Sequence, residues 1–122
     1  MTTFQKKLYE RPFEAIKKGS KKIEIRANKK ETSENSVNLM QRGDEIIFTK
    51  SKSEEKISCI IERITLYNST RELLEKEGTK YTLSSTDDLE EGIRSIESIG
   101  DYKELIAKNG VFAIELKDVK EA

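Results

Sequence analysis

The stretch PFEAIKKGSKKIEIR, residues 12–26, decides the fold because it joins a compact helix to a strand through a glycine turn. Pro12 suits the first turn of a helix, where a missing N–H costs no hydrogen bond. Phe13 and Ile16 are three residues apart and therefore lie on the same helical face. Gly19 is the residue type that most often ends a helix in the left-handed conformation. The stretch predicts a helix that buries one face and stops at Gly19.

Residues 22–26, KIEIR, alternate between charged residues and isoleucine, which is the period of a β-strand. The pattern predicts that the two isoleucines face inward and that Lys22, Glu24 and Arg26 share the opposite face. Alternate residues of a strand stand about 7 Å apart, and Lys21 lies at the mouth of this strand. A cation, a carboxylate and a second cation are therefore expected within a small volume.

The remaining segments predict an α+β domain with about six short β elements and helices between them. A first strand is expected near residues 5–9, and Gly43 and Asp44 are expected to fix a turn. The later strands cover residues 45–50, 57–66 and 111–117. Two later helices, over residues 71–76 and 85–99, are expected outside the sheet core, and a third short helix covers residues 101–108. Residues 27–39 have no hydrophobic period and predict a mobile loop.

The composition predicts a single domain over residues 1–122 and excludes several kinds of chemistry. The sequence shows neither a stretch of roughly 20 apolar residues nor the apolar core of a signal peptide, so we expect a cytoplasmic protein without a membrane partner. Because the chain has no histidine, histidine-based triads and metal sites are excluded. The lone Cys59 lies in an apolar run and predicts core packing. We expect no metal, no cofactor and no obligate protein partner.

Basic residues concentrate near the N-terminus although the formal net charge is zero. Residues 6–30 contain ten Lys and Arg residues against three Glu residues. Such asymmetry can steer a polyanion to one face, or it can simply keep the surface hydrated. Lys29 and Lys30 follow the predicted strand and are candidate phosphate contacts.

Three interpretations of Lys21, Glu24 and Arg26 follow from the residue types alone. An arginine held by a carboxylate is a preoriented fork for phosphate or a base edge, with the lysine as a flexible charge beside it. A lysine whose pKa is lowered by burial or by neighbouring cations could instead serve a small hydrolase as base or nucleophile, with Glu24 as proton carrier. The third interpretation is an exposed ion pair of little energetic value.

The opening stretch and two later ones together resemble the ASCH family. In ASCH domains the pattern P-F-x-x-I-x-x-G-x-K-x-x-E-x-R is followed by a G-D-x-I-x-F strand, which matches residues 43–48, and the end of the domain is similar to residues 110–116. The resemblance covers nearly the whole chain. It implies a small PUA-like mixed β-barrel with flanking helices and a cleft shaped by Pro12, Phe13, Ile16 and Gly19.

The resemblance also implies that the cleft binds RNA or a nucleotide-like small molecule. Carried over to this chain, the expected binding residues are Lys21, Glu24 and Arg26. Residue type and position add the candidates Lys22, Lys29, Lys30 and Tyr67. Tyr67 follows a strand and could stack on a base at the rim of the cleft, or it could only cover the core.

An enzyme remains the alternative that the same resemblance leaves open. Some small ASCH proteins are amidohydrolases of N4-acetylcytidine with a catalytic Lys, Thr and Glu, and related proteins are reported as metal-assisted ribonucleases. The motif lysine corresponds to Lys21, whereas the threonine of those enzymes falls where this chain has Glu24, which is a departure from their pattern. Lys21 and Glu24 are the catalytic candidates if the chain is an enzyme. The acidic group at residues 87–91 is interpreted as helix N-terminal charge, and no metal site is assigned.

Overall fold

The computed structural model describes residues 1–30 and 33–122 of the chain. Its strands are β1 (Thr3–Leu8), β2 (Ile23–Ala27), β3 (Glu45–Lys50), β4 (Lys56–Tyr67) and β5 (Val111–Glu121). Its helices are α1 (Glu10–Lys18), the 3-10 helix η1 (Val37–Leu39), α2 (Thr70–Glu77), α3 (Leu89–Glu97) and α4 (Tyr102–Asn109). The α+β class is confirmed, with five strands in the described residues where about six β elements were expected.

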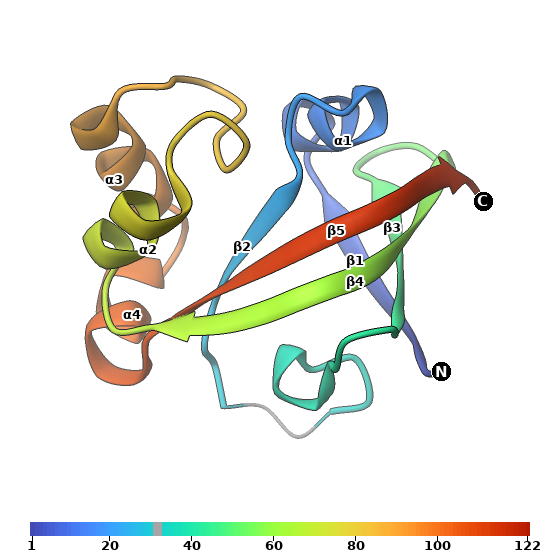
Figure 1. The fold of residues 1–122 in the computed structure, drawn as a ribbon, viewed down its shortest axis with the longest axis horizontal. Coiled ribbons are helices and arrows are strands. Elements are labelled where there is room, and N and C mark those ends of the chain that lie inside the picture. The colour runs from blue at the N-terminus through green and yellow to red at the C-terminus, as the bar shows by residue number, and fades with distance from the viewer. Residues whose placement is uncertain (31–32) are drawn as a thin grey trace.

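The strands form one curled sheet, a half-barrel with the order β1-β3-β4-β5-β2 (Figure 1). β1 runs parallel to β3, and the other neighbouring pairs are antiparallel. The β4–β5 ladder shifts register twice, between Ser58 and Ile60 and between Ile61 and Arg63, and such irregularities bend and twist a strand. β1 and β2 are the two edges of the sheet, so their outer backbone groups need partners from elsewhere.

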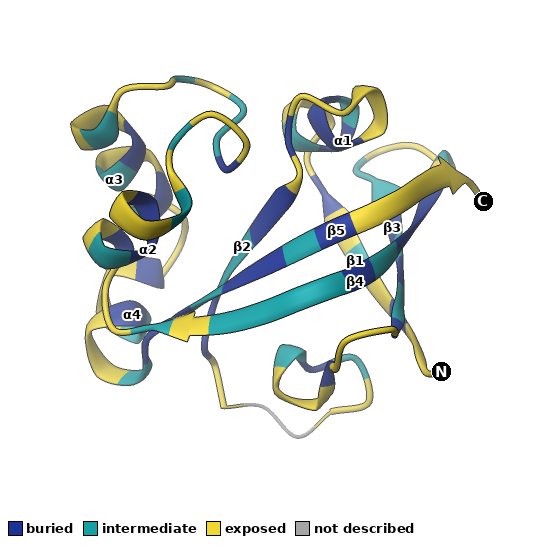
Figure 2. Ribbon diagram, in the orientation of Figure 1, coloured by how far each residue is buried: buried dark blue, intermediate teal, exposed yellow. Residues whose placement is uncertain are grey.

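Two hydrophobic clusters stabilise this fold (Figure 2). The first cluster joins β1, β3 and β4 to α1, and Phe13 and Ile16 are fully buried in it. The second cluster joins β2 and β5 to the three later helices, through residues such as Leu73, Ile96 and Ile106. α2 and α3 are therefore not outside the core, as the sequence suggested, because the apolar stripes of the later helices form a second core with two strands.

β2 is covered on both sides, so its isoleucines face a core as expected and its charged face is covered as well. Ile23 belongs to the second cluster and Ile25 packs against it, so the isoleucines face the helices. Glu24 is 5% exposed. It lies near Cys59 of the first cluster, whose pKa is raised to about 12 mainly by burial of the thiol and secondly by the Glu24 charge. The alternating sequence correctly places the isoleucines on one face of β2 and Glu24 on the other. Because helices cover the isoleucine face, the Glu24 face is the one that lies on the barrel side.

Local residue types explain how α1 ends and how the chain enters β2. Gly19 has φ of 89°, and its N–H donates to the Ile16 carbonyl. The Lys21 N–H then donates to the Ala15 carbonyl at 3.0 Å, which turns the chain back toward β2. The predicted helix and its glycine stop are confirmed.

Residues 27–39 are more structured than the loop that the sequence predicted. The Asn28 N–H donates to the Gly110 carbonyl, and the side-chain amides of Asn28 and Asn109 donate to each other's backbone carbonyls. Further along, Val37 in η1 packs against the first cluster. These segments lack a hydrophobic period because short polar contacts position most of them. Residues 31 and 32 of the expected loop lie outside the described residues.

Gly43 and Asp44 form the predicted turn into β3. Gly43 adopts φ of 90°, and its N–H donates to the Ile61 carbonyl at 2.8 Å. The Asp44 carboxylate accepts hydrogen bonds from the N–H groups of Thr2 and Gln41, at 3.1 and 2.9 Å. The turn role of both residues is confirmed, since their contacts are to neighbouring backbone.

Candidate functional site

Lys21 is buried where the turn after α1 meets β2, with 5% of its surface exposed. Its Nζ donates to the Ile23 carbonyl at 2.7 Å and to the Thr82 carbonyl at 2.6 Å, and it lies 3.7 Å from Glu24 Oε1. The bond to Thr82 joins segments that are 61 residues apart in the chain. Lys21 therefore anchors the segment around Thr82 against β2.

Glu24 connects Lys21 to Arg26, and we call these three residues the β2 network. Glu24 Oε2 accepts a hydrogen bond from Arg26 Nε at 2.8 Å, and Arg26 Nη2 donates to the Lys7 carbonyl at 2.9 Å. Because Lys7 lies in β1, Arg26 bridges the two edge strands of the half-barrel. Nη1 of Arg26 has no hydrogen-bond partner among the residues that the structure describes.

Burial and the Glu24 carboxylate act in opposite directions on the two cations of the β2 network. Burial lowers the pKa of Lys21 below its usual value, and the Glu24 charge offsets only part of this effect. Burial also disfavours the charge on Arg26, but the charge and hydrogen bond of Glu24 leave the pKa of Arg26 raised. Arg26 is thus a permanent cation, whereas Lys21 gives up its proton more readily than an exposed lysine does.

The β2 network lines a cavity of about 440 Å³, which we call the main cavity. Its walls come from β2, the end of β1, the start of α1, residues 82–85, and the helices α3 and α4. Tyr9, Pro12, Ile96 and Tyr102 give it apolar surface, while its hydroxyl groups come from Ser51, Thr82, Ser84, Ser85 and Ser95. The volume is within the range of small-molecule sites, about 300 to 1,000 Å³.

The sequence matches a known protein family over most of its length. The model of the ASCH domain matches residues 7–120. This chain belongs to the ASCH domain family. No protein with a curated description matches this chain.

Solved structures confirm the PUA-like fold of the ASCH domain. The crystal structure of the hypothetical protein PH0355 is 34% identical with a TM-score of 0.77, and the match covers 95% of this chain and 98% of that one. The solution structure of PF0455 from Pyrococcus furiosus is 33% identical with a TM-score of 0.69, covering 95% and 96%. An ASCH protein from Zymomonas mobilis, 16% identical with a TM-score of 0.67 and coverage of 98% and 70%, is similar in fold.

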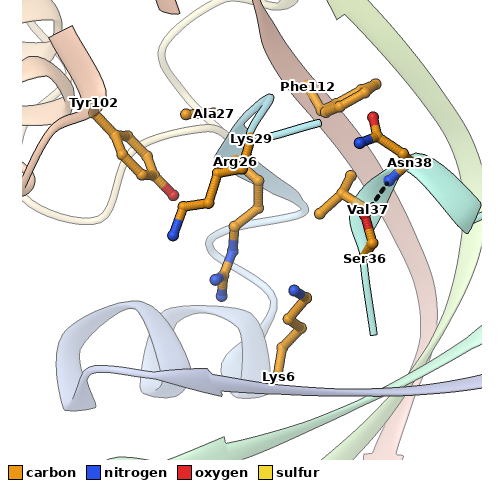
Figure 3. Close-up of a pocket in the computed structure, with 9 residues that line it drawn as sticks. All are labelled: Lys6, Arg26, Ala27, Lys29, Ser36, Val37, Asn38, Tyr102 and Phe112. Atoms are coloured by element: carbon orange, nitrogen blue, oxygen red, sulfur yellow. Dashed lines mark hydrogen bonds between the residues drawn. The ribbon is translucent and has the colours of Figure 1, made fainter. Parts of the chain in front are cut away.

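The ASCH domain brings some of the predicted ligand contacts together and separates others. Lys21, Glu24 and Arg26 line the main cavity, whereas Lys29 and Arg26 line a second, smaller pocket (Figure 3). Lys22 is exposed, and its Nζ lies 4.7 Å from the centroid of the Tyr81 ring. Lys22 is not part of the main-cavity wall.

Two further predicted contacts lie away from the main cavity. Lys30 is exposed, and its N–H donates to Asn28 Oδ1 at 2.9 Å. Tyr67 donates its hydroxyl hydrogen to Glu77 Oε2, and its ring packs against the second hydrophobic cluster. The position of Tyr67 favours the interpretation in which it covers the core.

The predicted cleft-shaping residues act at different distances from the main cavity. Pro12 lines the cavity directly. Phe13 and Ile16 are fully buried in the first cluster and hold α1 in place. Gly19 allows the left-handed turn that leads to Lys21.

Sequence reasoning missed the wall of the main cavity that lies far downstream of β2. Thr82 is 1% exposed and Tyr102 is 9% exposed, and both line the cavity. Their local sequence predicted only a polar connection and the start of a helix, so no local pattern indicated that they meet Lys21 and Arg26.

Residues 1–30 and 33–122 contain no cluster of three or more Cys, His, Asp or Glu residues arranged to hold a metal ion. Within the same residues, no helix has the length and apolar character needed to cross a membrane.

Proposed function

We propose that this ASCH domain binds RNA or a nucleotide derivative in the main cavity, with the β2 network as the recognition element. The observation that carries the proposal is the hydrogen bonding of the Arg26 guanidinium. The guanidinium is fixed by Glu24 and by the Lys7 carbonyl, yet Nη1 has no hydrogen-bond partner among residues 1–30 and 33–122, and Arg26 lines the main cavity. A guanidinium oriented in this way is preorganised to donate to a phosphate or to a base edge.

The lining of the main cavity fits a nucleobase with its sugar. Tyr9 is 75% exposed at the cavity wall, where its ring is accessible for stacking on a base. Tyr102 and Ile96 add apolar surface, and the serine and threonine residues of the wall offer hydroxyl groups for polar edges. Aromatic stacking together with a few positioned polar groups is how unpaired bases are usually held.

The three network residues have different roles in the proposal. Arg26 contacts the ligand, and Glu24 orients Arg26 while it also offers a carboxylate edge. Lys21 positions the segment around Thr82, because its Nζ donates to two backbone carbonyls. Lys22, Lys29 and Lys30 would supply phosphate contacts for longer RNA, whereas Tyr67 is left outside the site because its hydroxyl is bound to Glu77.

A hydrolase is the second candidate, and one observation favours it. A buried lysine with a lowered pKa beside a carboxylate, at the wall of a cavity, is an arrangement that active sites use. Against it, Lys21 Nζ donates to two backbone carbonyls, which holds the amine as a structural hydrogen-bond donor. Binding is therefore the function that the geometry supports better.

A thermal-shift panel tests the proposed function. The wild-type protein, Arg26→Gln and the control Arg42→Gln, whose side chain is 75% exposed, are heated with nucleosides, modified nucleosides, nucleotides and short single-stranded RNAs. We expect at least one ligand to raise the Tm of the wild type and of Arg42→Gln but not that of Arg26→Gln. If no compound raised the Tm of the wild type, or if the Tm rose equally in all three proteins, a site at Arg26 would be contradicted.

The same panel separates binding from turnover. Each compound that raises the Tm is incubated with the protein and analysed by chromatography. Release of product that Lys21→Ala abolishes would favour the hydrolase, provided that the variant still unfolds cooperatively. Recovery of the intact compound would leave binding as the function.

A further inference from the structure

A second pocket of about 50 Å³ lies beside the main cavity, and we call it the side pocket. Arg26 and Tyr102 line both spaces, so the side pocket and the main cavity meet at these two residues. Lys6, Lys29, Ser36 and Asn38 complete its polar lining (Figure 3). In Figure 3 the ends of Lys29, Arg26 and Lys6 turn toward the same space, and the Tyr102 hydroxyl is directed there as well.

The side pocket is cationic. Its lining includes Arg26, Lys29 and Lys6, and no carboxylate belongs to that lining within the described part of the chain. Glu24, the nearest acidic partner of Arg26, binds Nε and leaves Nη1 without a partner there. A concave surface of one charge sign attracts a ligand of the opposite sign.

Lys29 is held at this pocket by its neighbours. Asn28, which precedes it, is 6% exposed. Its side-chain amide donates to the Asn109 carbonyl at 3.2 Å, and its own backbone carbonyl accepts from the Asn109 side-chain amide at 3.0 Å. The Lys30 N–H, which follows it, donates to Asn28 Oδ1. The backbone on both sides of Lys29 is thus fixed, so its cationic side chain starts from a defined point at the pocket.

We propose that the side pocket is a phosphate subsite, so that the preferred ligand is a nucleoside monophosphate unit, either free or within single-stranded RNA. The inference rests on the proposed function, in which the main cavity holds the base and sugar. Arg26 then donates Nη1 to the phosphate, and Lys29 supplies the second cation. One water needs about 10–15 Å³ of such space, so a 50 Å³ pocket has room for a group of a few heavy atoms.

Isothermal titration with matched ligands tests this assignment. The four nucleosides, their 3′- and 5′-monophosphates, inorganic phosphate and a short single-stranded RNA are titrated into wild type, Lys29→Gln and Lys76→Gln. Lys76 is exposed on α2 and lines neither the main cavity nor the side pocket, so its variant controls for the loss of one positive charge.

The expected result is a monophosphate that binds at least about tenfold more tightly than its nucleoside, with an advantage that shrinks as salt rises. Lys29→Gln removes most of that advantage and leaves the nucleoside Kd within about twofold, while Lys76→Gln changes neither. A similar loss of RNA affinity in Lys29→Gln, without a preference for either free monophosphate, would assign the subsite to a phosphate of RNA.

Two results would overturn the inference, and they are distinguishable. Equal affinity for nucleosides and monophosphates, with RNA binding unaffected by Lys29→Gln, would remove the phosphate subsite and leave the main-cavity proposal standing. No binding by nucleosides, monophosphates or RNA would remove the proposed function as well.

Discussion

Two networks of arginine and glutamate in this chain have similar chemical parts but differ in completeness. In the network of Arg63, Glu77 and Glu115, which we call the β4–β5 network, Arg63 Nε donates to Glu115 at 2.9 Å. Both Nη atoms of Arg63 donate to Glu77, at 2.8 and 2.7 Å, and Nη1 also donates to Thr65. In the β2 network, Arg26 lines the main cavity, and its Nη1 has no partner among the described residues.

The difference separates a network whose donors are all used within the fold from one to which we assign a ligand. The guanidinium of Arg63 is used on all three nitrogens, and it joins β4 and β5 to α2, so its bonds stabilise the fold. The guanidinium of Arg26 is oriented by two bonds and keeps donor capacity for a ligand. Both networks contain an ion pair, and they differ in whether every guanidinium nitrogen of the arginine has a hydrogen-bond partner among the described residues.

The largest expected effect is on ligand affinity when Arg26 is changed. Arg26→Gln removes the oriented charge, so the Kd for the ligand with the largest thermal shift should rise about 100-fold, or about 2.7 kcal/mol. Arg63→Gln should leave the Kd within about twofold, because Arg63 lines neither pocket. Calorimetric titration measures both values. Equal losses of affinity in the two variants would erase the distinction between the networks.

The second expected effect is on stability, and it falls on the other arginine. Arg63→Gln leaves the Glu77 carboxylate, whose side chain is 7% exposed, without its charged partner, so the free energy of unfolding should fall by about 2 kcal/mol. Urea denaturation measures this change. The control Arg42→Gln breaks an exposed pair with Glu62 and should cost less than about 0.5 kcal/mol. Similar losses in both variants would contradict a structural role for Arg63.

The third expected effect is a pH dependence that reports burial beneath the β2 network. Burial, with a second contribution from the Glu24 charge, raises the pKa of Cys59 from 9.0 to about 12. The unfolded chain therefore loses this proton first, and folded-state stability falls as the pH rises from 9 toward 12. Relative to Cys59→Ala, the wild type should lose about 1 kcal/mol between pH 9 and pH 10. Parallel pH profiles would show that the thiol is accessible to solvent.

The smallest expected effect is a pH slope of opposite sign from Lys21. Burial lowers the pKa of Lys21 from 10.5, so below that pH the unfolded chain binds more protons than the folded one. Stability of the wild type relative to Lys21→Met should therefore rise with pH in the window that ends near 10.5. The β4–β5 network contains no lysine and provides no such slope. A falling difference would mean that the charged form of Lys21 is favoured in the fold.

Much of the β2 network was predictable because its members are close in sequence. The motif spacing placed Lys21, Glu24 and Arg26 together, and the structure confirms that they contact one another in sequence order. The helix stop at Gly19 and the strand β3 also followed from local residue types. These features depend on neighbouring residues, which a single sequence shows directly.

The remaining features depend on contacts between distant segments. Alternation in β2 could not show that helices cover its isoleucine face, so the charged face was not recognised as the barrel side. Thr82 and Tyr102 reach the main cavity only through tertiary packing, and the bond between Arg26 and Lys7 requires the curl of the whole sheet. Tyr67 follows a strand and could lie at the cleft rim or cover the core, and the sequence could not show that its hydroxyl bonds to Glu77 in α2.

The most direct test of the central claim is an NMR titration of the ¹⁵N-labelled protein with a nucleoside monophosphate. The account predicts that the shifted amides cluster in β2, in residues 82–85 and around Tyr102, where the main cavity lies. Saturating amide shifts confined to β4 and α2, around Arg63 and Glu77, would contradict binding in the main cavity, because the ligand would then bind at the β4–β5 network.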